Sequence, residues 1–199
     1  MDETGFQMGV ILTAKVICGA DTRDSRAKAV QPGNREWATA IIAVNASRWA
    51  LPPYIVLAAE NHQSQWYNNI PSNYQLSVSK NGWTTDKLGL DWLQNYFDIY
   101  TASRTVGRYY LLILDGHSSH AAAGFDKFCT ERMIIPLYMP PHSSHRLQPL
   151  DVTCFSPLKH FYSKQTTKMM ENGVFSIKKE DFLYTFPSVF ERAISSSNI

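Results

Sequence analysis

The sequence predicts an α/β domain whose mixed sheet combines an antiparallel hairpin with parallel strands and is flanked by helices. Two observations favour this class. Before residue 85 the apolar runs are short and rich in β-branched residues, and they are separated by turn residues. After residue 85, helical and strand patterns alternate, which is typical of parallel strands joined by helices. With 199 residues, 44% of them hydrophobic, the chain is long enough for one such domain, and we treat residues 1–199 as a single domain.

The hairpin comes from residues 39–44 (TAIIAV) and 54–59 (YIVLAA). Asparagine, serine and two prolines lie between these runs and predict a turn. We expect residues 51–59 to return beside residues 37–44. Residues 31–35 (QPGNR) form another turn, and residues 61–82, which have no clear period, are expected to be irregular.

A helix is predicted to begin near Thr85, a good N-cap residue, because Leu90, Leu93, Phe97 and Tyr100 then recur at helical spacing. Residues 109–114 (YYLLIL) are continuously apolar, which predicts a central strand buried on both faces.

Residues 121–132 predict a short helix, and residues 134–139 a strand that Pro136 confines to an edge or a bulge. The longest helix is expected from residue 148 to about residue 170, with a start complicated by Pro149 and Pro157. Its apolar side carries Phe155, Leu158, Tyr162 and Met169, and His160, Lys164 and Lys168 follow another side. A last helix is predicted over residues 176–195, interrupted near Pro187.

Composition narrows the functional classes. The formal charge of +2 neither requires nor excludes nucleic acid as a partner. Cys18, Cys129 and Cys154 include no C-x-x-C pair and are expected to be reduced thiols that pack in the interior. No apolar stretch reaches 18 residues and no secretory signal is visible, so we expect no membrane partner.

Three aspartates stand at informative positions: Asp2 near the start, Asp115 directly after the apolar run 109–114, and Asp151 after Leu150. Ligands of open α/β sheets collect beyond the carboxyl ends of strands, which favours a functional role for Asp115. The alternative is a turn or cap aspartate, because Asp-Gly is a common turn pair.

Long and unusual strings surround these aspartates: DETGF over 2–6, LLILDGHSSH over 111–120 and PPHSSHRLQPLDVTCF over 140–155. With QPGNREW over 31–37, they resemble the DDE superfamily of endonucleases. Within it, the chain is most similar to the pogo, Tigger and jerky group of mariner-like transposases, in particular those of fungi. The resemblance extends from Asp2 to about Phe190 and implies an RNase H-like fold, which agrees with the mixed sheet.

The resemblance implies that Asp2, Asp115 and Asp151 are a catalytic triad that binds divalent metal, with Asp2 on the first strand, Asp115 on the adjacent strand and Asp151 at the start of a helix. Carboxylates are the ligands that Mg²⁺ prefers, and two ions about 4 Å apart can activate a nucleophile and stabilise a leaving oxyanion. We therefore expect two Mg²⁺ or Mn²⁺ ions, no organic cofactor, and DNA (transposon ends and target) as the substrate. Which aspartate bridges the ions is left open.

The histidines allow two interpretations. His117, His120, His142 and His145 form two H-x-x-H pairs, which could make a four-histidine zinc site. Because both pairs lie inside the strings of the resemblance, we favour a supporting role in which they orient the aspartates or contact phosphate. Glu3 is a weaker candidate, because strand alternation turns it away from Asp2.

Basic residues gather in two groups: Arg23, Arg26, Lys28 and Arg35 near the early turns, and Arg146, Lys159, Lys164 and Lys168 around the third aspartate. The second group is expected to contact the DNA backbone; the alternative is an ordinary solvated helix face. Trp66, Trp83 and Trp92 could stack on an unpaired base, although packing is the more common role of tryptophan.

The sequence also departs from the family. Only Met1 precedes Asp2, so we expect the first strand to be truncated and the domain to be partial at both ends, without the helix-turn-helix region of the family. An active nuclease and strand-transferase is the first hypothesis. A catalytically silent, host-adopted nucleic-acid-binding protein and a decayed remnant are the alternatives. Nuclear localisation and a homodimer are further expectations.

Overall fold

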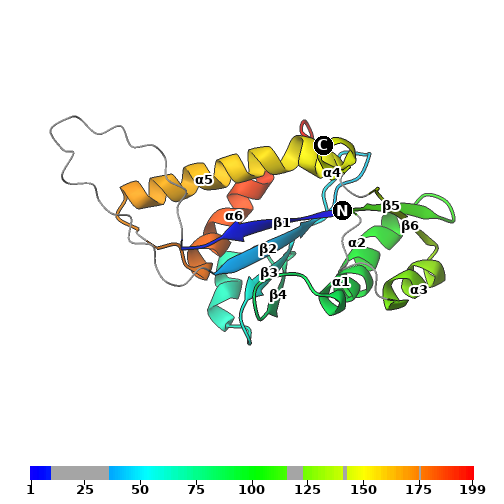
Figure 1. Ribbon diagram of the computed structural model, residues 1–199, viewed down its shortest axis with the longest axis horizontal. Coiled ribbons are helices and arrows are strands. Elements are labelled where there is room, and N and C mark those ends of the chain that lie inside the picture. Colours follow the sequence, from blue (N-terminus) through cyan, green and yellow to red (C-terminus); the bar gives the residue numbers. More distant parts are fainter. Residues whose placement is uncertain (10–35, 116–122, 141–142, 175) are drawn as a thin grey trace.

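The computed structural model describes residues 1–9, 36–115, 123–140, 143–174 and 176–199. Figure 1 shows α5 and α6 crossing one face of the main sheet, while α1, α2 and α3 gather with a second, small sheet. Within these ranges, no helix is long and apolar enough to cross a membrane.

The main sheet has the order β1-β2-β3-β4. Its strands are β1 (Asp2–Gln7), β2 (Trp37–Ile42), β3 (Tyr54–Ala58) and β4 (Gln75–Ser79). The predicted hairpin is confirmed, because β2 pairs antiparallel with β3. β1 adds antiparallel to β2 and β4 adds parallel to β3, so the sheet is mixed.

Residues 61–82 are more regular than predicted. They contain a 3-10 helix, η2 (Ser64–Asn69), and strand β4. β4 has the alternation of a half-buried strand, with Leu76 buried at 2% exposure. The prediction failed because Leu76 and Val78 are its only apolar side chains, and pairing with β3 supplies the rest of its stability.

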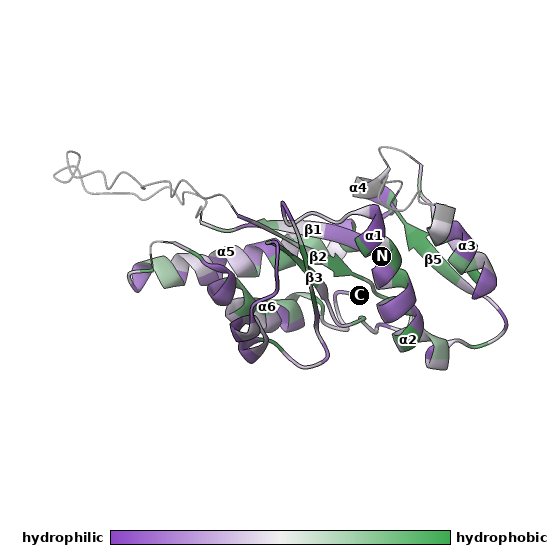
Figure 2. Cartoon of the chain, turned by 90° about the horizontal axis from the view of Figure 1, so that it is seen from below, coloured by the Kyte–Doolittle hydropathy of each residue, from purple (hydrophilic) through white to green (hydrophobic). Residues whose placement is uncertain are grey.

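The small sheet pairs β5 (Tyr110–Leu114) with β6 (Ile134–Tyr138) in parallel. Pro136 lies in β6, whose ladder is with β5, in agreement with the predicted edge position. The prediction that β5 is buried on both faces is wrong, because Leu112 and Leu114 are buried whereas Leu111 is 56% exposed. Figure 2 shows β5 as a hydrophobic strand at one end of the molecule.

The helix predicted from Thr85 is confirmed. It runs through α1 (Asp86–Trp92), a π-helical turn η3 (Leu93–Phe97), α2 (Asp98–Thr101) and η4 (Ala102–Arg104). The Thr85 hydroxyl accepts from the Leu88 nitrogen as an N-cap. After β5 comes α3 (Ala123–Glu131), which lies within the range predicted.

The C-terminal helices follow α4 (Ser144–Leu147) and a π-helical turn, η6 (Leu150–Cys154). They are α5 (Phe155–Glu171) and α6 (Lys179–Ala193). The interruption expected at Pro187 is wrong, because α6 continues through it. The hydrogen bond that proline cannot donate is offset by the packing of Phe182, Phe186 and Phe190 into the core.

Two hydrophobic clusters lie on opposite faces of the main sheet. One joins Ala40, Ile42 and Ile55 to α5 and α6. The other joins Ile41 and Val56 to α1, η3, α3 and β5. Three tryptophans were candidates for stacking on a base. Trp66 and Trp92 are buried core residues, and Trp83 is exposed.

Candidate active site

Asp2 is the first residue of β1 and is 5% exposed. Alternation along the strand places Asp2, Thr4 and Phe6 on the more buried face, and Glu3 on the other. The Phe6 ring packs edge-on against Tyr162 of α5, with 5.0 Å between the ring centroids. Asp2 therefore faces the α5 layer, and Glu3 points to the opposite side, as the sequence predicted.

Asp115 directly follows β5 and is partly exposed. Its position relative to β1 is set by a hydrogen bond of 2.9 Å from the Met1 nitrogen to the Ile113 carbonyl. Within the described residues β1 and β5 belong to different sheets. The single continuous mixed sheet expected from the sequence is thus found as two sheets, linked here at Met1.

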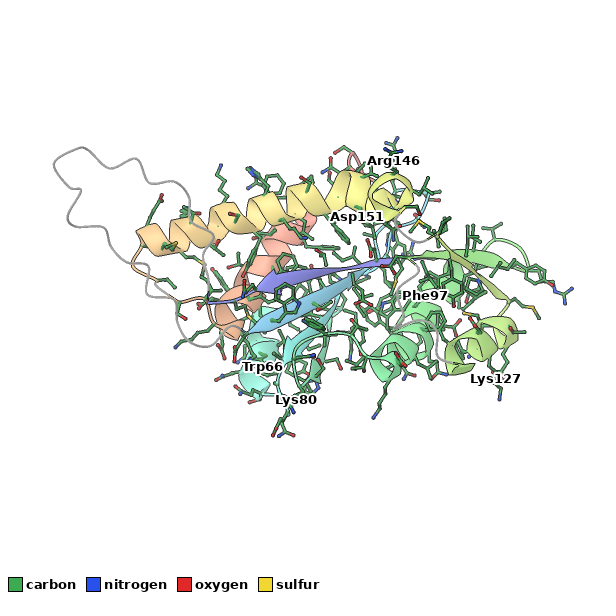
Figure 3. All side chains as sticks on the ribbon, in the orientation of Figure 1. Trp66, Lys80, Phe97, Lys127, Arg146 and Asp151 are labelled. Carbon is green, nitrogen blue, oxygen red and sulfur yellow. The ribbon has the colours of Figure 1, made fainter. Side chains whose placement is uncertain are left out.

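Asp151 lies in η6, one turn before α5, and its side chain is exposed. Buried Leu150 and Cys154 anchor this π-helical turn in the core. Single π-helical turns are frequent at functional sites, because the wider turn re-aims the side chains around it. Figure 3 shows Asp151 and Arg146 at the start of α5, near the N-terminal end of β1.

The three aspartates influence one another electrostatically. Burial raises the pKa of Asp2 to about 7, even though the Glu3 nitrogen donates a 2.7 Å hydrogen bond to its Oδ1 atom. The negative charges of Asp115 and Asp151 raise the same pKa further. Asp115 and Asp151 are therefore near enough to influence the charge of Asp2, although they are far from it in the sequence. Their catalytic role remains a prediction.

Carboxylates are the ligands that a hard divalent cation prefers, and the charges of Asp115 and Asp151 act on the buried Asp2. In the described part of the chain, however, no group of three or more His, Cys, Asp or Glu side chains is arranged tightly enough to hold one ion. Asp115 and Asp151 are less buried than Asp2.

Most of the histidines with predicted roles are not among the residues that the structure describes. His117, His120 and His142 lie outside the described residues, and for His145 only the backbone in α4 is described. The zinc and supporting interpretations both remain predictions. Of the cysteines, Cys129 and Cys154 are buried free thiols, as expected, and Cys18 lies outside the described residues.

The second basic group lies on the exposed surface of α4 and α5. Arg146 is exposed in α4, and Lys159, Lys164 and Lys168 are exposed along α5. The apolar side of α5 is buried at Phe155, Leu158 and Tyr162, so the predicted division of this helix into two sides is confirmed. In the early basic group, Arg23, Arg26, Lys28 and Arg35 lie outside the described residues.

Gln148 is a residue to which the sequence analysis gave no role. It is 1% exposed and its Nε2 atom donates a 2.9 Å hydrogen bond to the Met1 carbonyl. A cavity of about 610 Å³ lies beside it, lined also by Trp49, Arg104 and Tyr109. An amide inside the otherwise apolar stretch LQPL was the signal available in the sequence.

Comparison with known proteins matches residues 34–199 to the family described as DDE superfamily endonuclease. The chain is 46% identical over its whole length to "MFS-type transporter clz9" of Cochliobolus lunatus, of which it covers 21%. It is 31% identical, over 68% of its length, to mouse "Pogo transposable element with KRAB domain", covering 22% of that protein. The chain thus spans about a fifth of these relatives.

Among solved structures, the fold resembles that of the "Mos1 transposase paired-end complex with left transposon end". The TM-score is 0.50 at 15% identity, over 99% of this chain and 55% of that one. This likeness supports the RNase H-like mixed α/β fold expected from the sequence. The match of the family description to more than half of the residues carries the assignment further: the chain belongs to the DDE superfamily of endonucleases.

Proposed function

We propose that this domain is the catalytic domain of a DNA transposase, which hydrolyses phosphodiester bonds and transfers strands with the help of bound Mg²⁺ or Mn²⁺. The observation that supports the proposal is that the charges of Asp115 and Asp151 act on the buried Asp2 and contribute to its raised pKa. A buried carboxylate surrounded by like charges is unfavourable unless a cation or a proton compensates it.

Each aspartate contributes differently to this site. Asp2 is the fixed ligand, because it is buried in a paired strand. Asp115, at the end of β5, and Asp151, in the η6 turn, would supply the other two carboxylate ligands. Divalent ions held in this way would polarise the attacking oxygen and stabilise the leaving one. Arg146, Lys159, Lys164 and Lys168 would hold the backbone of the DNA beside the carboxylates.

Metal binding and DNA cleavage test the proposal together. We expect isothermal titration of the 199-residue chain with Mn²⁺ to give saturable binding that Asp2→Asn weakens at least tenfold. We also expect nicking of supercoiled plasmid that needs Mg²⁺ or Mn²⁺ and stops when EDTA is added. A folded wild-type chain that binds no Mn²⁺ and nicks no DNA at any metal concentration would refute the nuclease.

A catalytically silent, DNA-binding descendant of a transposase is the second candidate. It is favoured by the absence, among the described side chains, of a ready-made group of three metal ligands. Saturable DNA binding that is indifferent to metal, with no nicking, would select this candidate over the nuclease.

We further propose that the protein acts in the nucleus, because its substrate would be chromosomal DNA, and that it acts as a homodimer, because transposition joins two ends. Fluorescence microscopy of a tagged chain and the molar mass from light scattering in the presence of DNA test these two points. Exclusion from the nucleus, or a monomeric complex, would contradict them.

A further inference from the structure

Three segments of the chain meet at the backbone of Met1. Its nitrogen donates to the Ile113 carbonyl of β5, and its carbonyl accepts from the Gln148 side chain, both at 2.9 Å. These partners are 112 and 147 residues away in sequence. We call this pair of hydrogen bonds the Met1 junction.

Each segment at the Met1 junction carries one of the three aspartates within a few residues. Asp2 is next to Met1, Asp115 is two residues after Ile113, and Asp151 is three residues after Gln148. The main-chain carbonyl of Gln148 also accepts from the Val152 nitrogen at 3.1 Å. Gln148 thus contacts β1 with its side chain and the turn that holds Asp151 with its backbone.

We propose that Gln148 is a positioning residue, which sets the location of Asp151 relative to Asp2 and thereby tunes the affinity of the carboxylate site for divalent metal. This inference rests on the proposed metal-dependent function. The chemistry explains the residue type: a carbonyl needs a donor, and an amide supplies one without adding a fourth negative charge beside Asp2. The amide is buried, so water does not replace the bond when it is lost.

The test compares two variants that each lose one buried hydrogen bond from a side chain to a carbonyl. Gln148→Met keeps the length of the side chain and removes the donor. Thr39→Val is the matched control, because the Thr39 hydroxyl donates at 2.8 Å to the Gly82 carbonyl, in a buried bond that does not join the three segments. Both variants are expected to melt at a lower temperature than the wild type.

The first readout needs no metal. In crystal structures of the metal-free proteins, Gln148→Met is expected to displace residues 150–154 relative to β1, whereas Thr39→Val leaves them in place. The second readout is the Mn²⁺ dissociation constant, which should rise about tenfold in Gln148→Met and stay at the wild-type value in Thr39→Val, in line with the loss of a residue that orients metal ligands.

Unchanged placement of Asp151 in Gln148→Met, or an unchanged Mn²⁺ affinity, would overturn the positioning role. If Gln148→Met does not fold, Gln148→Asn replaces it: the amide remains but is one methylene too short, and a smaller displacement with an intermediate loss of affinity is expected. If the wild type binds no Mn²⁺, the proposed function fails, and the displacement of residues 150–154 still decides whether Gln148 positions Asp151.

Discussion

Two buried aspartates, Asp98 and Asp2, have opposite surroundings. Asp98 is 7% exposed at the start of α2, accepts a 2.8 Å hydrogen bond from the Tyr110 hydroxyl, and lies 3.3 Å from the Nε atom of Arg132. Asp2 is 5% exposed, accepts from a backbone nitrogen, and has two further carboxylates as electrostatic neighbours.

The difference separates a carboxylate that the fold pairs with a cation from one that it places near further carboxylates. The charge of Asp98 is compensated by groups that the fold provides, so this residue fastens α2 to β5 and to the end of α3. Burial, and then the charges of Asp115 and Asp151, raise the pKa of Asp2 by more than the Glu3 nitrogen and the amino terminus lower it. The charge of Asp2 therefore destabilises the folded chain unless a proton or a cation binds. Burial alone would not have distinguished the two.

The largest expected effect is on the rate of DNA nicking, which should fall when an aspartate near Asp2 is replaced but not when Asp98 is replaced. Asp115→Asn should lower metal-dependent nicking by a factor on the order of 10²–10³ or more, because a charged ligand is lost where charge develops in the reaction. Asp98→Asn should keep the wild-type rate per folded molecule. Plasmid nicking at a temperature where both variants are folded measures this. Nicking that persists in Asp115→Asn would show that Asp115 is not part of the catalytic site.

The next effect is a pH dependence of stability. The pKa of Asp2 is about 7 in the folded state and 3.8 in the unfolded state. Its contribution is therefore fully present below about pH 4 and is lost as pH rises to about 7, by up to roughly 4 kcal/mol. Without metal, Asp2→Asn should thus be more stable than the wild type at pH 8, by a larger margin than at pH 5.

Urea unfolding of the wild type and Asp2→Asn at both pH values, with EDTA present, checks this prediction. Taking the difference between the two proteins cancels the titrating groups that do not interact with Asp2, whereas the amino terminus, whose pKa is about 6, interacts with it and contributes to the difference. An equal margin at pH 5 and pH 8 would show that Asp2 is not destabilised by its charge, and the contrast with Asp98 would disappear.

A smaller effect tests the structural aspartate. Asp98→Asn should cost about 1–3 kcal/mol of unfolding free energy, because the Tyr110 hydroxyl and Arg132 lose a charged acceptor; the half-exposed Arg132 keeps the cost low. Urea unfolding at pH 7 measures it. A gain in stability, as expected for Asp2→Asn, would mean that Asp98 is also uncompensated.

The smallest effects concern cations, where a similar contrast exists. Arg132 is paired with Asp98, whereas no ion pair is found for Lys164 or Lys168 among the described residues. If these two lysines contact DNA phosphates, the double variant Lys164→Ala/Lys168→Ala should bind DNA of any sequence more weakly and reduce the salt slope of binding by about 2.

The matched control for this variant is Lys80→Ala/Lys127→Ala, which removes two exposed lysines far from α5 (Figure 3). Fluorescence anisotropy of labelled duplex between 50 and 200 mM salt, the range over which phosphate contacts weaken strongly, provides both slopes. Equal slopes for the two double variants would assign Lys164 and Lys168 to an ordinary solvated surface.

The amino-acid sequence alone determined the hairpin, the N-cap at Thr85, the two sides of α5 and the positions of the aspartates at the ends of elements. Each depends on contacts between residues a few positions apart, which periodicity and turn chemistry report directly. Predictions from local sequence failed at β4 and at Pro187, where packing against distant segments outweighs local preference.

Only the tertiary structure decided which carboxylate is compensated and which is not. Asp2 and Asp98 each have an apolar neighbour in the sequence, and the local sequence does not show which distant groups lie near either charge. Arg132, which directly follows α3, is 34 residues from Asp98 in the sequence, and hydrogen bonds at Met1 that close loops of more than one hundred residues link the segments of Asp115 and Asp151 to that of Asp2. The energy of interaction between two charges depends on their distance in space, and the folded chain sets that distance.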